Sequence, residues 1–373
     1  MTAAKPEGAT RKRGGGLQHR LRAIADRVLQ HQRPEPTNFK TINLALQGGG
    51  AHGAFTWGVL DALLEDERLD FEAISGTSAG AMNAVALADG LMRNGTLGAR
   101  DRLGAFWRRV SQEGSSGGAA GELVKSMLGF WHMQAFSPFS FFEQFANFMS
   151  PYRSNPLNIN PLRDLIGHLI DFDNVRANDG LKLFVSATNV RSGKIKVFSG
   201  EEITADAIMA SACLPYIFQA VEIGNEAYWD GGYTGNPALF PFFDETETPD
   251  ILVVQVNPVW RDDLPTSPRE ITERASEITF NSSLLREFRA IDFVNRLMDE
   301  GRLDPGRYRR NHVHRIDATE ALAQYSAASK LDTSWHFFQE LHAAGRAAAQ
   351  QWLKEHYDDI GVRSTIDLRA EFG

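Results

Sequence analysis

The chain is poor in cysteine and contains no long apolar run. Cys213 is the one cysteine among its 373 residues, so no intramolecular disulfide can form and nothing indicates an oxidising compartment. No stretch of 18 consecutive apolar residues is present, which argues against a membrane-spanning helix. The basic N-terminal residues are followed by no apolar h-region, so a secretory signal is not expected. These absences favour a cytoplasmic protein.

Charge is distributed unevenly along the chain. Residues 1–40 contain nine Lys/Arg against three Asp/Glu, whereas the whole chain has a net charge of −8. We expect residues 1–40 to form a basic, partly disordered extension with a short helix around Leu17–Gln30. A basic arm that contacts anionic lipid at a membrane or lipid surface is the alternative. An acidic body without interleaved aromatic and basic residues argues against nucleic acid as a partner.

Hydrophobic periodicity predicts strands alternating with helices from residue 41 onward. Thr41–Gln47 and Phe71–Ser75 have the pattern of short buried strands, and Ala54–Glu67 and Ala79–Leu91 have helical spacing. Such alternation is typical of an α/β fold with a mainly parallel, covered sheet. Further strands are expected at Leu181–Asn189, Lys194–Ser199, Glu226–Asp230 and Ile251–Asn257, and further helices at Glu270–Gly301 and Thr333–His356. We expect one catalytic domain over 41–373, with a motif-bearing core at 41–257 and a helical C-terminal part at 258–373.

The first chemical motif is a glycine-rich turn, GGGAHG, at residues 48–53. Its spacing also fits a dinucleotide site, but the acidic residue Asp70 stands at the wrong end of the second strand for that role. A P-loop needs Lys and Ser/Thr after the last glycine, and Ala54 and Phe55 stand there instead. Free amides at a helix N-terminus also stabilise a developing oxyanion. That interpretation is favoured, and a purely structural turn stays open.

The second motif is GTSAG at residues 76–80, between a predicted strand and a predicted helix. A serine in such a turn is exposed on a sharp bend, because flanking glycines avoid clashes that larger residues would cause. Ser78 is therefore the candidate nucleophile, in a nucleophile turn whose other members are Gly76, Thr77, Ala79 and Gly80.

A serine nucleophile needs a base, and Asp230 is the preferred candidate. It ends a predicted strand and is followed by Gly231 and Gly232, which leave room for a substrate. A buried carboxylate has a raised pKa and can accept the serine proton directly. His312 and His314 are weaker candidates for a base or a metal ligand.

Four blocks in order resemble the signatures of the patatin-like phospholipases. They are LALQGGGAHGAF, GTSAGAMNA, ASACLPYIF and YWDGGYTGNP. The resemblance implies a three-layer α/β/α fold and hydrolysis of lipid acyl esters by a Ser–Asp dyad without histidine, metal or cofactor. It makes Ser78 the nucleophile and Asp230 the base, with Gly231 and Gly232 as the base turn. The oxyanion hole would comprise Gly48, Gly49, Gly50, Ala51, His52 and Gly53.

One residue departs from the family pattern. The glycine block of the family usually has Arg before its last glycine, and His52 stands at that position here. Arginine is always charged, whereas histidine changes its charge near neutral pH. If that position stabilises the anion, activity is lowered or depends on pH. We favour a bracing role, in which a neutral histidine suffices.

Three further features concern the substrate and the surface. Phe130–Met149 contains eight Phe/Trp in twenty residues, which indicates a core helix, or a lid or acyl-chain channel for an apolar substrate. The acidic residues of Asp244–Asp250 and the pair Asp262/Asp263 lack the spacing of a calcium loop and are expected at the solvated surface.

An acyltransferase with a non-water acceptor and a non-catalytic lipid-binding protein remain the alternative functions. Thr77 counts against malonyl transacylases, which usually carry histidine at that position.

Overall fold

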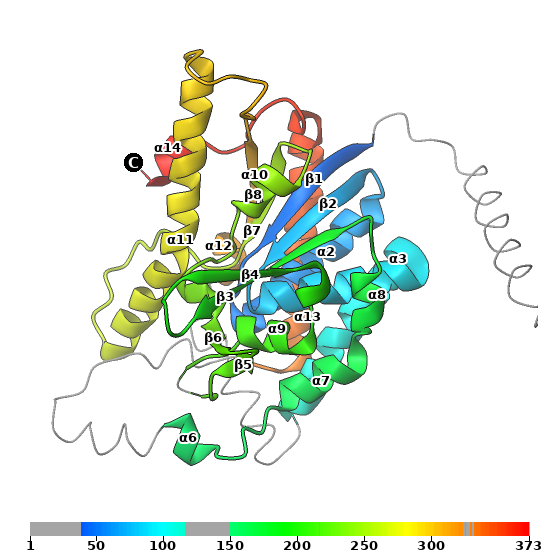
Figure 1. Ribbon diagram of the computed structural model, residues 1–373, viewed down its shortest axis with the longest axis vertical. Helices are drawn as coiled ribbons and strands as arrows, with labels where there is room; N and C mark the ends of the chain where they lie inside the picture. Colours follow the sequence, from blue (N-terminus) through cyan, green and yellow to red (C-terminus); the bar gives the residue numbers. More distant parts are fainter. Residues whose placement is uncertain are drawn as a thin grey trace, which may run out of the picture. The chain divides into compact units, whose positions relative to one another are not determined.

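The protein is described by a computed structural model that covers residues 39–115, 150–215, 217–323, 325, 329 and 332–372. Its centre is one eight-stranded sheet with the order β5-β6-β3-β2-β1-β7-β8, and β4 pairs with β3 outside that path (Figure 1). The pairings between β3, β2, β1, β7 and β8 are parallel, whereas β4, β6 and β5 pair antiparallel. The strands are β1 (Lys40–Leu46), β2 (Leu69–Gly76), β3 (Lys182–Asn189), β4 (Ile195–Ser199), β5 (Val221–Ile223), β6 (Glu226–Asp230), β7 (Asp250–Gln255) and β8 (His312–Asp317).

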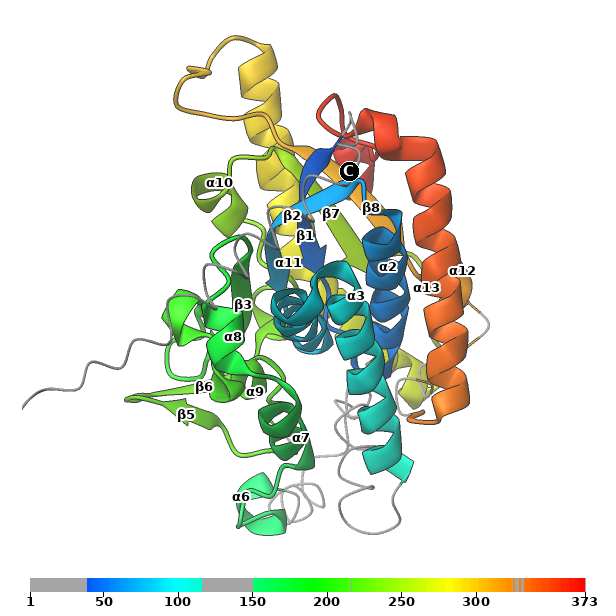
Figure 2. The ribbon, with the colours of Figure 1, turned by 90° about the vertical axis from the view of Figure 1, so that its right-hand side faces the viewer.

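Helices cover both faces of this sheet. On one face lie α2 (Gly53–Asp66), α3 (Ala79–Ser115) and α13 (Trp335–His356), and on the other lie α10 (Pro241–Glu245), α11 (Pro268–Asp299) and α14 (Leu368–Phe372). Figure 2 shows α2 and α13 side by side on one side of β1, with α11 on the opposite side. The shorter helices are α6 (Pro151–Ser154), α7 (Pro161–Leu169), α8 (Phe172–Arg176), α9 (Ala205–Ser211), α12 (Thr319–Leu322), η1 (Gly50–His52), η3 (Gly200–Glu202), η4 (Gly231–Tyr233) and η6 (Tyr357–Asp359).

Alternation along the central strands builds a separate hydrophobic core on each face. In β1, Leu44 and Leu46 belong to the core beneath α2 and α3, whereas Ala45 belongs to the core beneath α11. In β7, Val254 and Val253 divide in the same way. Because successive side chains of a strand point to opposite faces, an uninterrupted apolar strand needs helices on both sides. The predicted three-layer α/β/α arrangement with a mainly parallel sheet is confirmed.

The elements expected around the motifs are confirmed, with boundaries shifted by one to a few residues. The helix predicted at Ala79–Leu91 continues to Ser115 after a kink, where Gly95 adopts φ of 58°, a conformation that glycine adopts without steric cost. The C-terminal part is helical, but it also supplies β8, which pairs with β7 at the edge of the sheet. The segments Leu17–Gln30 and Phe130–Met149 lie outside the described residues.

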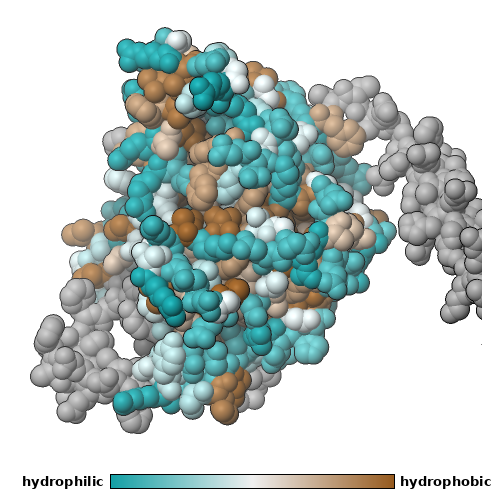
Figure 3. All heavy atoms as spheres, viewed as in Figure 1, coloured by the Kyte–Doolittle hydropathy of each residue, from teal (hydrophilic) through white to brown (hydrophobic). Residues whose placement is uncertain are grey.

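The face of the described part that Figure 3 shows is largely polar. Hydrophilic residues predominate on the face seen in Figure 3, and hydrophobic ones are scattered among them. Within the described ranges, no helix combines the length and the apolar character that a membrane crossing requires.

Candidate active site

The glycine turn and the nucleophile turn lie against each other at the carboxyl ends of two neighbouring strands. β1 and β2 are parallel, and Leu46 is paired with Gly76 at their ends, so the turns that follow leave the same edge of the sheet. A Cβ atom placed on Gly48 would lie 2.9 Å from the Cβ of Ser78. Only a glycine at residue 48 allows the two turns to approach this closely. The structure therefore brings together the two motifs that the sequence singled out.

Ser78 occupies a strained bend between β2 and α3. Its φ is 53°, as is typical of a serine at a sharp strand-to-helix turn. The residue is buried, however, and not exposed as the motif predicts. The bend is held on one side by Thr77, whose Oγ1 donates to the carbonyl of Gly235 at 2.7 Å. It also requires Gly80, because a Cβ there would lie 2.2 Å from the carbonyl oxygen of Leu46.

Ser211 holds the backbone of the nucleophile. The N–H of Ser78 donates to Ser211 Oγ at 2.9 Å, and both residues are buried. Ser211 is the last residue of α9 and lies in the ASACLPYIF block, where it begins a Ser-x-x-x-Pro segment that ends at Pro215. This segment was identified from the sequence, but its hydrogen bond to the nucleophile turn spans 133 residues and has no local sequence signal.

Asp230 is the last residue of β6 and is fully buried. Its backbone N–H donates to the carbonyl of Cys213 at 2.7 Å, and its Oδ1 accepts from the N–H of Gly232 at 2.7 Å. Gly231 and Gly232 leave no space for a side chain, since a Cβ on Gly232 would lie 1.7 Å from the ring of Phe280. The two glycines thus turn the chain tightly around the carboxylate.

Burial dominates the acidity of Asp230. Desolvation raises its pKa to about 7, although the N–H of Gly232 and the hydroxyl of Ser78 each act in the opposite direction. The second carboxylate oxygen, Oδ2, accepts no well-formed hydrogen bond from any residue that the structure describes. The hydroxyl of Ser78 therefore acts on the carboxylate of Asp230, and Oδ2 has no other partner among the described residues. Catalytic hydrogen bonds are commonly long in unliganded structures and shorten when substrate binds.

The glycine turn leads through η1 into α2 and presents backbone amides. The N–H of Gly48 is already occupied, because it donates to Asn236 Oδ1 at 2.7 Å. Among the described residues, none accepts a hydrogen bond from the amides of Gly49 or Gly50. Gly50 has φ of 59°, so this turn needs glycine at that position. The N-terminus of α2 lies against that of α3, since a Cβ on Gly53 would lie 2.8 Å from the Cβ of Ala79.

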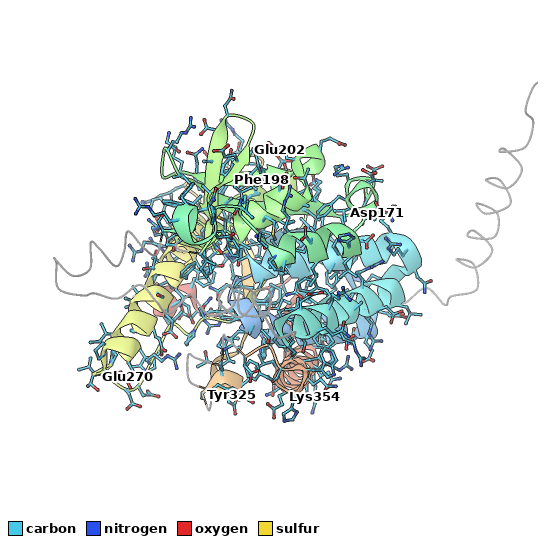
Figure 4. All side chains as sticks on the ribbon, turned by 90° about the horizontal axis from the view of Figure 1, so that it is seen from below. Asp171, Phe198, Glu202, Glu270, Tyr325 and Lys354 are labelled. Atoms are coloured by element: carbon cyan, nitrogen blue, oxygen red, sulfur yellow. The ribbon has the colours of Figure 1, made fainter. Side chains whose placement is uncertain are left out.

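His52 is buried beside this turn. Its Nε2 lies 2.9 Å from Ser329 Oγ, and its ring is tilted against Phe337 with 6.4 Å between centroids. Tyr325, labelled in Figure 4, packs edge-on against Phe337 at 5.2 Å. His52 therefore connects the glycine turn to the segment before α13 and to α13 itself. These contacts agree with a bracing role.

The late histidines lie away from these turns. His312 and His314 of β8 both contact the carboxylate of Asp250, at 3.3 Å and 3.0 Å. Asp250 is the first residue of β7, so this cluster lies at the amino end of a parallel strand and the glycine turn at the carboxyl end. His342 contacts Asp61 at 3.1 Å instead. Within the described ranges, no group of three or more His, Cys, Asp or Glu residues is suited to a metal ion.

The expectation that Asp250 lies at the solvated surface is wrong. Asp250 is 1 % exposed, and its Oδ1 also accepts from the N–H of Gly361 at 2.8 Å. Its two histidine contacts and this N–H hold the pKa of the carboxyl well below its usual range against the opposing effect of burial. The acidic run in the sequence gives no sign of these partners, which come from β8 and from the C-terminal loop that contains Gly361. Cys213, in contrast, is buried as its small apolar neighbours suggest, and burial raises the pKa of its thiol to about 12.

Sequence reasoning missed the buried amide side chains that surround the glycine turn. They are Gln47, Asn236, Asn257 and Asn281. Asn236 lies in the block after Asp230, and Gln47 directly precedes the glycines, so their positions beside two motifs were the only available signals. Asn281 of α11 is remote from every motif.

Comparison with known proteins gives one family match and several distant structural neighbours. The family model for patatin-like phospholipases matches residues 44–243, more than half of the chain. Among solved structures, VipD from Legionella pneumophila is 15% identical with a TM-score of 0.43, and the match covers 84% of this chain and 67% of that one. The type III effector ExoU is 16% identical with a TM-score of 0.36, over 85% of this chain and 53% of that one. This chain thus spans about half the length of the matched ExoU chain.

No curated protein matches the chain. The family match includes the glycine turn, the nucleophile turn and Asp230. The structure adds the three-layer fold in which those motifs meet. The chain therefore belongs to the patatin-like phospholipases, a family of lipid ester hydrolases.

Proposed function

We propose that this protein hydrolyses acyl esters of phospholipids, lysophospholipids or other long-chain lipids through a Ser78–Asp230 dyad. The observation that carries this proposal is the pairing of a strained serine with a fully buried aspartate whose pKa is raised to about 7. A carboxylate with a pKa near neutrality is a far better base than an ordinary aspartate. The family match adds the substrate class.

The proposed reaction has two steps. Ser78 Oγ gives its proton to Oδ2 of Asp230 and attacks the ester carbonyl carbon, which forms a tetrahedral oxyanion. Collapse of this intermediate breaks the ester bond, and the leaving alcohol takes the proton from Asp230. Water then attacks the acyl-serine, again with Asp230 as base, and releases the fatty acid and free Ser78.

The glycine turn supplies the oxyanion donors in this proposal. The N–H of Gly48 donates to Asn236, so we assign the donor role to the amides of Gly49 and Gly50. These amides precede the N-terminus of α2, whose dipole favours a negative charge there. Gly48 instead keeps the turn in contact with Ser78, and His52 braces it.

The catalytic domain that we propose extends over residues 41–373. Its central site draws on β1, β2 and β6, and its braces come from α11 and from the segment that contains Ser329. Because the substrate is a lipid, we propose that the protein meets it at the surface of a membrane or a lipid aggregate.

The test measures turnover of a long-chain p-nitrophenyl ester and of phosphatidylcholine vesicles. Ser78→Ala should lower kcat by about 10⁴-fold or more, and Asp230→Asn should have a similar effect. Ser75→Ala is the matched control, because Ser75 is a buried serine of β2, the strand that leads into the nucleophile turn, and its hydroxyl donates to the carbonyl of Ala238 at 2.6 Å. Undiminished turnover in purified Ser78→Ala would refute the proposal.

A further inference from the structure

Gly48 is held by a side-chain amide on each of its two backbone polar atoms. Its N–H donates to Asn236 Oδ1 at 2.7 Å, and its carbonyl accepts from Asn257 Nδ2 at 2.7 Å. Asn236 follows β6, and Asn257 follows β7. Two short hydrogen bonds to one glycine, from segments that follow two different strands, restrict the backbone rotation that a triple-glycine turn otherwise has.

The bond from Asn257 determines where the next amide points. The carbonyl of Gly48 and the N–H of Gly49 belong to one planar trans peptide, in which they point in opposite directions. Fixing that carbonyl on Asn257 therefore fixes the direction of the Gly49 N–H. A flipped peptide would reverse this direction and put a carbonyl oxygen where the N–H now points.

Asn257 is itself held in a single orientation. Gln47 Oε1 accepts from the backbone N–H of Asn257 at 3.0 Å and from its Nδ2 at 3.3 Å. Asn281 Nδ2 donates to the carbonyl of Asn257 at 3.3 Å, and Gln47 Nε2 donates to Asn281 Oδ1 at 3.0 Å. Nδ2 of Asn257 faces two oxygen acceptors. Exchanging the nitrogen and the oxygen of this side-chain amide would place oxygen against oxygen, so only one orientation is allowed.

The cluster is also fully enclosed. Gln47 is 0 % exposed, Asn257 1 % and Asn281 3 %. Burying several amides is costly unless each is paired, and apolar residues would fill the same space at lower cost. Amides are the suitable choice where a backbone carbonyl must be held in one direction.

We infer that Asn257 is a positioning residue for the oxyanion hole, which sets the Gly49 N–H toward the reacting carbonyl, and that Gln47 and Asn281 keep it in place. This inference rests on the proposed function. It predicts that the cluster acts on the transition state, where the oxyanion exists, rather than on substrate binding.

Asn257→Asp tests this role, because it keeps the size of the side chain and removes the donor to Gly48. We expect kcat on a p-nitrophenyl ester to fall about 10²- to 10³-fold, as when one oxyanion donor is lost, with KM changed less than about threefold. Asn43→Asp is the matched control. Asn43 is a buried asparagine of β1 whose Nδ2 donates to the carbonyl of Thr248 at 3.2 Å, so the control carries a similar folding cost away from the turns.

Asn257→Ser, which keeps a shorter hydroxyl donor, serves as the second variant and covers the case in which Asn257→Asp does not fold. We expect its kcat to lie between those of the wild type and Asn257→Asp. The inference is overturned if kcat falls no further than in Asn43→Asp, if Asn257→Ser retains wild-type kcat, or if the loss appears in KM. Ser78→Ala measured in parallel separates the two claims. If Ser78→Ala is inactive and Asn257→Asp is fully active, only the positioning role fails, whereas an active Ser78→Ala refutes the proposed function itself.

Discussion

The hydroxyl of Ser211 accepts a hydrogen bond from the backbone N–H of Ser78 at 2.9 Å. Because Ser78 has φ of 53°, its turn needs fixed partners to persist. The contact links the C-terminal end of α9 to the start of α3 and makes Ser211 part of the support of the proposed nucleophile.

Ser211→Ala should weaken this support. The buried N–H of Ser78 would lose its acceptor, at a cost of about 1–3 kcal/mol in the free energy of unfolding, and the misplaced serine should lower kcat about 10- to 100-fold. Ser364→Ala is the control, since Ser364 Oγ accepts from the N–H of Val313 at 3.0 Å, remote from the glycine turn. Equal loss of stability in both variants, with equal kcat, would contradict this prediction.

Activity should depend on the ionisation of Asp230. Its pKa is raised to about 7 and the base must be ionised, so kcat/KM should rise with pH and level off above neutrality. Two pH units below the pKa, about 1 % of the base is ionised, and kcat/KM should be about 100-fold below its plateau. A profile that stays flat from pH 5 to 8 would exclude Asp230 as the base.

Ionisation of Asp230, which should raise activity, should lower the free energy of unfolding. The pKa of Asp230 is higher in the folded protein than the ordinary value of 3.8. Its stabilising contribution to the free energy of unfolding is therefore fully present below about pH 4 and is lost as pH rises through about 7. Asp230→Asn removes this dependence. Denaturant unfolding should show the variant gaining stability relative to the wild type between pH 5 and pH 8, and an unchanged difference over that range would count against the raised pKa.

The contact between the two turns should not tolerate a methyl group at residue 48. A Cβ on Gly48 would lie 2.9 Å from the carbonyl oxygen of Thr77 as well as from Ser78, so Gly48→Ala must push the turns apart. We expect kcat to fall by about 100-fold or more. Gly104→Ala is the control, because its nearest neighbour would be Trp57 at 3.7 Å and it lies within α3. It should keep full activity and gain up to about 1 kcal/mol in helix stability. A Gly48→Ala variant with the wild-type kcat would show that the two turns can separate without loss of catalysis.

His52 should act through its packing and its contact to Ser329. His52→Gln keeps a nitrogen able to reach Ser329 Oγ and should retain kcat within about threefold. His52→Ala loses that contact and the packing against Phe337, and should lose about 2 kcal/mol of stability. A loss in His52→Gln as large as that in Ser78→Ala would instead assign His52 a direct role at the oxyanion.

Asp250 should matter for stability and not for catalysis. Its pKa is lowered in the folded protein, so its contribution is present above about pH 4 and is lost as pH falls below that value. Asp250→Asn should therefore cost about 3 kcal/mol at pH 7 and have the wild-type kcat. The exposed Asp244 offers the control, and Asp244→Asn should change neither property. A large loss of kcat in folded Asp250→Asn would indicate coupling between the two ends of the sheet.

Local chemistry made much of the site predictable. A glycine turn after an apolar strand, a serine between glycines and an aspartate before two glycines each constrain their own backbone within a few residues. Helical and strand periodicity likewise located β1, α2, β2 and the start of α3, because each buries an apolar face. β8 was not among the predicted strands, although His312 and His314 alternate as on the edge of a strand. Asp250 was misjudged because its neutralising partners lie 62 and 64 residues further along the chain.

The sequence by itself determined the candidate nucleophile, the candidate base, the glycine turn and the class of fold, because these depend on residue type and on spacing within single turns. Only the tertiary structure decided which amides are available, how acidic Asp230 is and what holds the turns together. The N–H of Gly48 is occupied by Asn236, 188 residues away, and its carbonyl by Asn257, 209 residues away. Desolvation and hydrogen bonding depend on every group that packs around an atom, and those groups come from strands and helices that meet only when the sheet forms.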